Sequence, residues 1–403
     1  MTSEILTVQI KTIADVIMGQ SPSSDSCNIT GEGLPFYQGV TDFGVLNPNP
    51  RMYCNNPKRV AEIDDILFSV RAPIARINIA NHRCATGRGV AIIRAKKNSD
   101  QLYLRYAIES IWWYWDSLEG SGAIFSNAKK EDILNAEIPW GDENYRGKIT
   151  AHLSSLENLK LIKNTLVSDV RDFAQSLFRS WFIDFDPVIA KSEGKLPYGM
   201  DDETAALFPN SFEISELGKI PAGWKVKSLL EVSNLYDNLR VPLSSMERNE
   251  RKGNYPYHGA TSVMDYVDDF IFDGVHLLIA EDGSVVNEDG YPVLQYVWGK
   301  FWVNNHAHVL QGKDDVTTEH LHQYVKHFYI QPFVTGAVQL KINQKALHNV
   351  KLVTAPPNIN NAFNKIIQSL YRSIRENKME NEILTLTRDV LLPRLMSGGL
   401  KVN

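Results

Sequence analysis

The sequence predicts a mixed α/β (α+β) protein: two homologous globular domains separated by a pair of long antiparallel coiled-coil helices. Three observations predict it. The chain repeats itself, each copy ends in a long heptad stretch, and short β-branched runs bounded by turn residues precede each stretch. A length of 403 residues leaves room for two or three domains.

An internal repeat is the strongest signal. Early in each half the offset is 220 residues, so that Pro22 falls on Pro242, and later it is 214, so that Leu177 falls on Leu391. Ordered matches with a small drift are typical of homologous units that differ in loop length. Within the domains, apolar runs predict strands at residues 66–70, 77–80, 90–93, 276–280 and 306–310, and helical stretches at 102–118 and 320–329.

Heptad spacing begins at Ile149 in the first copy and at Phe363 in the second. Each stretch predicts a helix of about 35 residues, roughly 50 Å long at 1.5 Å per residue. Lys163 and Asn377 place polar groups near the middle of each seam, where such groups can set register. The predicted segments are a first domain at 1–142, a helix at 143–183, a linker at 184–215, a second domain at 216–356 and a helix at 357–397.

Composition limits the class of protein. A net charge of −5 argues mildly against nucleic-acid binding, although Lys and Arg crowd residues 58–97. Three cysteines, Cys27, Cys54 and Cys84, match neither a disulfide framework nor a zinc pattern. We expect no signal peptide, no membrane span and a cytoplasmic location.

Motifs for catalysis are missing from the sequence. It contains no phosphate-binding Gly-x-x-x-x-Gly-Lys-Ser/Thr loop, and no glycine-rich cofactor loop with the Asn/Asp-Pro-Pro-aromatic element of a base methyltransferase. We therefore expect no catalytic centre, no cofactor and no metal in this chain. One alternative stays open, a metal-dependent nucleic-acid enzyme, because His306 and His308 would face one side of a strand near Glu281 and Asp282. Another is a coiled-coil adaptor that binds only proteins.

Loop residues with hydroxyl, amide, imidazole and guanidinium groups suit phosphates and base edges. They follow turn signals at matching places in the two halves. The aromatic run at residues 112–115 is expected to pack in the core rather than stack on bases. The predicted DNA-contacting residues are Ser21, Ser23, Gln38, Thr41, Arg71, Arg76, Arg88, Arg240, His258, Thr261, Asn305 and His306.

Four stretches resemble the specificity (S) subunits of type I restriction-modification systems: residues 19–23 with 34–39, 177–188, 207–224 and 391–398. The resemblance covers essentially the whole chain. It departs most at residues 240–244, where Arg-Val-Pro-Leu-Ser replaces the Gly-Gln-Ser-Pro-Ser pattern of residues 19–23.

The resemblance implies a non-catalytic subunit in which each domain recognises one half of a bipartite DNA target. It implies that the helices set the spacing and dock two methyltransferase subunits, which carry S-adenosylmethionine, and that a motor-nuclease subunit joins for cleavage. The heptad positions expected to serve partner binding are Leu156, Lys163, Val170, Leu177, Leu370, Asn377, Leu384 and Leu391.

Overall fold

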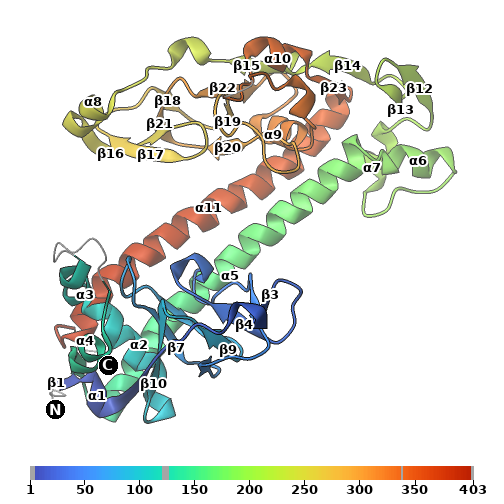
Figure 1. Cartoon of the computed structure of the whole chain (residues 1–403). Coiled ribbons are helices and arrows are strands. Elements are labelled where there is room, and N and C mark those ends of the chain that lie inside the picture. The colour runs from blue at the N-terminus through green and yellow to red at the C-terminus, as the bar shows by residue number, and fades with distance from the viewer. Residues whose placement is uncertain (1–4, 120–126, 337–338, 401–403) are drawn as a thin grey trace. The chain divides into compact units, whose positions relative to one another are not determined.

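The computed structural model describes residues 5–119, 127–336 and 339–400, and the chain divides into two compact units (Figure 1). Unit 1 comprises Met1–Lys163 and Glu380–Asn403, and unit 2 comprises Asn164–Met379. The division crosses both long helices, α5 (Glu143–Phe182) and α11 (Pro357–Met396). Each unit therefore holds one globular domain and a segment of each helix.

The first domain, the globular part of unit 1, is built on two main sheets. Their strand orders are β2-β10-β7-β8 and β3-β5-β4-β9-β6, and β1 pairs with β11. The strands are β1 (Leu6–Gln9), β2 (Ala14–Met18), β3 (Cys27–Asn28), β4 (Leu34–Tyr37), β5 (Tyr53–Cys54), β6 (Val60–Ala61), β7 (Ile66–Ser69), β8 (Ile77–Ile79), β9 (Cys84–Thr86), β10 (Val90–Ala95) and β11 (Glu137–Trp140). The helices are α1 (Ile10–Ile13), α2 (Gln101–Ser110), α3 (Trp112–Glu119) and α4 (Lys130–Asn135), with 3-10 turns η1 (Ser24–Ser26), η2 (Val40–Asp42) and η3 (Asn98–Asp100).

The second domain, the globular part of unit 2, repeats this topology. Its sheet β15-β22-β19-β20 has the order of β2-β10-β7-β8, and β14 pairs with β23 as β1 does with β11. The predicted pair of similar mixed α/β domains is therefore confirmed. The elements of unit 2 are α6 (Asp186–Ser192), α7 (Asp202–Leu207), β12 (Phe212–Ser215), β13 (Gly218–Pro221), β14 (Lys225–Ser228), η4 (Leu229–Glu231), β15 (Ser233–Leu235), η5 (Asp237–Leu239), α8 (Ser245–Glu250), β16 (Lys252–His258), β17 (Val263–Val267), β18 (Phe272–Asp273), β19 (His276–Ala280), β20 (Leu294–Val297), β21 (Lys300–Val303), β22 (Ala307–Gly312), α9 (Thr318–Lys326), η6 (Gln331–Phe333), α10 (Gln344–Asn349) and β23 (Lys351–Thr354).

The two long helices pair within each unit, and in unit 1 they run antiparallel. Tyr145 near the start of α5 hydrogen-bonds to the carbonyl of Leu395, near the end of α11. Further along, the Glu157 carboxylate lies 3.7 Å from Arg388, and Lys163 forms an ion pair with Glu380. Residues further along α5 therefore contact residues nearer the start of α11, as in any antiparallel pair of helices. None of the described helices is apolar enough over a sufficient length to cross a bilayer.

Aromatic side chains join the helices to the second domain in unit 2. The Phe178 ring of α5 lies 6.0 Å from the Phe363 ring of α11 and 5.0 Å from the Tyr324 ring of α9. The linker docks here as well, because the Phe208 ring meets the Trp181 ring edge-on at 5.1 Å. Leu196 of the same linker is 79% exposed, so the linker is only partly held by apolar contacts.

Several predicted elements differ from the structure. The helical stretch at 102–118 is broken at Ile111 into α2 and α3, and the stretch at 320–329 already ends at Lys326. Core packing of the aromatic run was expected, and it is right for Trp115, which is buried against Phe68, but wrong for Trp112 and Trp113. A helix at the surface packs only one face against the core, and Trp112 and Trp113 lie off that face.

His320 of α9 supplies the first testable prediction. Its ring is fully buried among aromatic side chains, and burial lowers its pKa to about 3. The unfolded chain binds a proton at this residue below about pH 6.5, whereas the folded chain does not. The contribution to stability is fully present above that pH and is lost as the pH falls from about 6.5 towards 3, by about 1.4 kcal/mol per pH unit. His320→Phe should therefore reduce the acid sensitivity of unit 2, measured by urea unfolding across this pH range.

His348→Ala is the matched control, because His348 lies exposed on α10 of the same unit. An equal change of pH dependence in both variants would contradict the assignment to His320.

Candidate nucleic-acid interface

Four segments of the first domain meet at one edge of its sheets. The amide of Gly19, after β2, donates to the carbonyl of Val90 at 2.9 Å, and the amide of Gly87, after β9, donates to Tyr37 at 2.8 Å. The amide of Val70, after β7, donates to Gly89 at 3.0 Å. The strand ends therefore bring together loops that are up to seventy residues apart in sequence.

Glycine is required where these loops touch. A Cβ added to Gly89 would lie 2.1 Å from the carbonyl oxygen of Gln38, and one added to Gly19 would lie 2.2 Å from that of Gly87. No side chain fits such a gap. Gly19 and Gly89 thus allow these loops to pack closely against one another.

This edge, which we call the arginine edge, holds four of the predicted DNA-contacting residues: Ser21, Gln38, Arg71 and Arg88. The Arg88 Nε donates to Ser21 Oγ at 3.5 Å, and the Gln38, Arg71 and Arg88 side chains are exposed. Ser23 and Thr41 are also exposed. Arg76, in the same β7–β8 loop as Arg71, lines a cavity of about 780 Å³ together with Val40 and Trp112. The structure places these residues, and their contact with DNA stays a prediction.

Ion pairing divides the basic residues of the first domain into two groups. Arg51, Arg83 and Arg94 are neutralised by Asp42, Glu62 and Asp65. In the described part of the chain, no carboxylate pairs with Arg59, Arg71 or Arg88. Arg59 was not among the predicted contacts, yet its carbonyl accepts from Thr86, which places it beside the Gly87 turn. The basic stretch at 58–97 was the signal that could have identified it.

The predicted residues of the second domain fall into an exposed group and a buried group. Thr261 and Asn305 are exposed, and His306 is half-exposed in the turn that precedes β22. His258 is buried and its Nδ1 lies 2.9 Å from Gln295, whose amide donates to the carbonyl of Gly259. Burial lowers the pKa of His258 despite that hydrogen bond. His258 therefore supports the 258–262 loop, and its burial favours a structural role over direct DNA contact.

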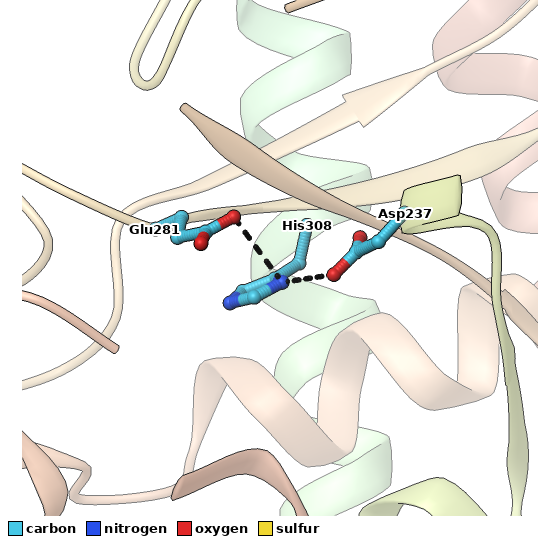
Figure 2. Close-up of side chains that lie close together, drawn as sticks. All are labelled: Asp237, Glu281 and His308. Carbon is cyan, nitrogen blue, oxygen red and sulfur yellow. Dashed lines mark hydrogen bonds and ion pairs between the residues drawn. The ribbon is translucent and has the colours of Figure 1, made fainter. Parts of the chain in front are cut away.

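Arg240 belongs to a buried cluster with Asp237, Glu281 and His308. Its Nη1 lies 2.6 Å from Glu281 and donates to the carbonyl of Ala307 at 2.8 Å. His308, on β22, is fully buried, and its Nδ1 lies 2.6 Å from Asp237 (Figure 2). Its Nε2 lies 2.7 Å from the carbonyl of Ile342. Burial alone would raise the pKa of Asp237, but the hydrogen bond from His308 and the nearby Arg240 outweigh it and lower the pKa.

The metal-enzyme alternative is not supported by this geometry. His306 and His308 do not share a site, because His306 lies in a turn and its Nδ1 contacts Asp282 at 2.8 Å, whereas His308 contacts Asp237. Asp237, Glu281 and His308 do lie close enough together to bind an ion. However, both nitrogens of His308 already have partners, and the guanidinium of Arg240 pairs with both acids and offsets part of their negative charge.

The residues predicted for partner binding all lie half-buried along the helices: Leu156, Lys163, Val170, Leu177, Leu370, Asn377, Leu384 and Leu391. Other apolar residues of the helices are exposed and were not predicted. On α5 these include Leu159, Ile162 and Phe173, which are 41%, 63% and 55% exposed. On α11, Ile383, Leu386 and Val390 are 61%, 65% and 54% exposed. Spacings of three and eleven residues on α5, and of three and four residues on α11, place each set on one helix face.

Comparison with known proteins agrees with the resemblance inferred from the sequence. Residues 221–385 match the family model of the type I restriction modification DNA specificity domain. The type I restriction enzyme MjaIX specificity subunit of Methanocaldococcus jannaschii is 24% identical over 98% of this chain and 93% of that protein. The MjaX specificity subunit of the same organism is 40% identical over 37% of this chain. The resemblance to type I specificity subunits is confirmed.

The alignment with the MjaX subunit covers only 35% of that protein's length. The alignment with the specificity subunit S.HindORF215P of Haemophilus influenzae likewise covers only 36% of that protein's length. Among solved structures, the S subunit of the type I restriction-modification system from M. genitalium matches with a TM-score of 0.60 over 98% of this chain and 96% of that one. At 16% identity this match shows a shared fold.

Removal of the Asp237 carboxylate tests the structural role of the buried cluster. Asp237→Ala leaves His308 and Arg240 buried without the carboxylate that they contact. The free energy of unfolding should therefore fall by about 3–5 kcal/mol. Asp268→Ala, which breaks the exposed pair with Arg251, should change it by about 0–1 kcal/mol. Dialysis of the parent chain against a chelator should leave its unfolding transition unchanged, and a chelator-induced loss matching that of Asp237→Ala would restore the metal interpretation.

Proposed function

We propose that this chain, which carries a type I restriction modification DNA specificity domain at residues 221–385, is the non-catalytic DNA-recognition subunit of a type I restriction-modification complex. The observation that carries the proposal is the arginine edge. It gathers Arg71 and Arg88 beside hydroxyl and amide groups, at strand ends, without a carboxylate among their described contacts.

Unpaired guanidinium groups suit the two tasks of DNA recognition. They neutralise phosphates, which gives affinity, and they can bond to two acceptors of guanine, which gives specificity. Gln38 adds a side chain able to bond adenine in the same bidentate manner. A net charge of −5 is compatible with this, because the acidic residues that pair with Arg51, Arg83 and Arg94 leave the arginine edge itself basic.

Each domain is proposed to recognise a different half of a bipartite site. The shared topology supports two equivalent ways of approaching DNA, and the side chains at the corresponding loops differ. The second domain offers Thr261, Asn305 and the His306–Asp282 pair instead of arginines. Different donors and acceptors would select different bases. The expected half-sites are therefore unequal, which makes the full target asymmetric.

The long helices are proposed to set the spacing of the half-sites and to dock two methyltransferase subunits, which hold S-adenosylmethionine. A motor-nuclease subunit would join that assembly. The exposed apolar faces of α5 and α11 support docking, because apolar side chains in regular helical spacing are a typical protein-binding surface. The alternative of an adaptor that binds only proteins shares this surface, and it is the arginine edge that favours DNA recognition.

Removal of two unpaired guanidinium groups tests DNA recognition. In the complex assembled with its methyltransferase subunits, Arg71→Ala with Arg88→Ala should weaken binding to the duplex that the complex methylates by about 1–3 kcal/mol per residue. If these groups contact phosphates, the slope of log affinity against log salt should also fall by about one for each. Titration of labelled duplex at several salt concentrations measures both.

Arg83→Ala is the control, because the Arg83 side chain is 59% exposed but paired with Glu62. Equal losses in the control and the double variant would remove the arginine edge from the interface. A complex that binds no duplex sequence in preference to another would favour the protein-only adaptor.

Leu386→Asp tests the helical docking face. The side chain is 65% exposed, so folding should be unaffected, whereas a charge in an apolar interface should weaken methyltransferase binding by about 2 kcal/mol or more, roughly thirtyfold in Kd. Ile63→Asp provides a control of similar exposure, 60%, in a loop of the first domain. Calorimetric titration of the methyltransferase subunit into each variant would decide, and unchanged affinity for Leu386→Asp would exclude this face.

A further inference from the structure

Two of the three cysteines lie directly opposite each other in the first domain. Cys27 of β3 and Cys54 of β5 are partners in an antiparallel pair, followed by Asn28 and Tyr53. Both are free thiols. We propose that Cys27 and Cys54 form a reversible intrachain disulfide, a modification site confined to the first domain. The proposal rests on local geometry and is independent of the function proposed above.

The hydrogen bonds around the pair define its type. The amide of Asn55 donates to the carbonyl of Ser26 at 2.9 Å. This bond joins the residue after Cys54 to the residue before Cys27, which makes the cysteines a non-hydrogen-bonded pair. In such a pair the Cα atoms are about 4.5 Å apart and the side chains are closest. A disulfide needs Cα atoms about 4.4–6.8 Å apart, so the backbone already meets the requirement.

The thiols also point towards the same short segment. Cys27 Sγ lies 3.7 Å from the carbonyl oxygen of Ser23, and Cys54 Sγ lies 3.9 Å from Ser26 Oγ. Ser23 directly precedes the η1 turn and Ser26 is its last residue, so both sulfur atoms face this turn. Cys84 is excluded as a partner, because it lies on β9 and β4 separates β9 from β5 in the sheet.

Access differs between the two thiols and sets the order of the reaction. Cys27 is half-buried and Cys54 is fully buried, so an oxidant reaches Cys27 first. A hydroperoxide is the class of oxidant required. The Cys27 thiolate attacks an oxygen of hydrogen peroxide to form a sulfenic acid and hydroxide, and the Cys54 thiolate then attacks that sulfur and displaces a second hydroxide. The two protons released when the thiols ionised convert both hydroxides into water. Two thiols and one hydrogen peroxide give one disulfide and two waters.

Burial, followed by the neighbouring Cys54 thiol, raises the pKa of Cys27. The thiolate is the reactive form, so the reaction should be slow at neutral pH and quicken about tenfold per pH unit below the thiol pKa. The bond would tie the segment that carries Ser21 and Ser23 to β5. Because every cysteine of the chain lies in the first domain, oxidation would act on that domain and leave the second unchanged.

The experiment uses the full chain, reduced and freed of reductant, then treated with hydrogen peroxide. Remaining thiols are alkylated under denaturing conditions, and peptides are identified by mass spectrometry. We expect a linked Cys27–Cys54 peptide pair, alkylated Cys84, return of all three thiols after dithiothreitol, and a rate that rises with pH. Cys84→Ser should form the same linked pair.

Cys54→Ala is the complementary variant, in which oxidation should stop at a Cys27 sulfenic acid that dimedone can trap. Oxidation of the parent chain to a Cys27 sulfinic acid with Cys54 still alkylated would overturn the proposal. Disulfides joining two chains, or joining Cys27 to Cys84, would overturn it equally.

Discussion

The packing of each long helix against a distant part of the chain is the constraint on which the structure depends. In unit 1, Leu392, Leu395 and Met396 from the end of α11 join a core that the first domain and the start of α5 also form. In unit 2, Phe178 and Trp181 from the end of α5 join the core of the second domain. The core of each domain includes side chains from a long helix that lies far away in the sequence. The helices therefore complete the two cores as well as connecting the domains.

The elements with strong periodicity were predictable from the sequence. The repeat and the heptads from Ile149 and Phe363 predicted two similar domains and two long helices, because a helical period sustained over about ten turns is typical of a single long amphipathic helix. Short elements were predicted less well. His306 was placed on a strand, but the strand begins at Ala307, and that shift of one residue separates His306 from His308. Alternation over five residues cannot define a strand end that closely.

The candidate interface depended on tertiary information that no local pattern contains. Arg71, Arg83 and Arg88 look alike in the sequence, and only the folded chain shows that Glu62 neutralises Arg83. Arg240 was predicted to contact DNA, yet Glu281, forty-one residues later, draws it into a buried cluster. The charge that a surface offers to a partner is the charge left after ion pairs have formed within the protein. Which residues form such pairs across long sequence distances is set by the topology of the sheets.

The nesting of one unit inside the other affects the order in which the protein matures. Unit 2 is an uninterrupted stretch, Asn164–Met379, whereas unit 1 is completed by Glu380–Asn403. During synthesis, the first domain leaves the ribosome first, but Leu392, Leu395 and Met396 of its core emerge last. The nascent chain therefore passes through a stage in which unit 2 is complete while the first domain still exposes apolar surface, a stage at which chaperones would be needed. Deletion of the last few turns of α11 would accordingly destabilise the first domain, at the opposite end of the sequence.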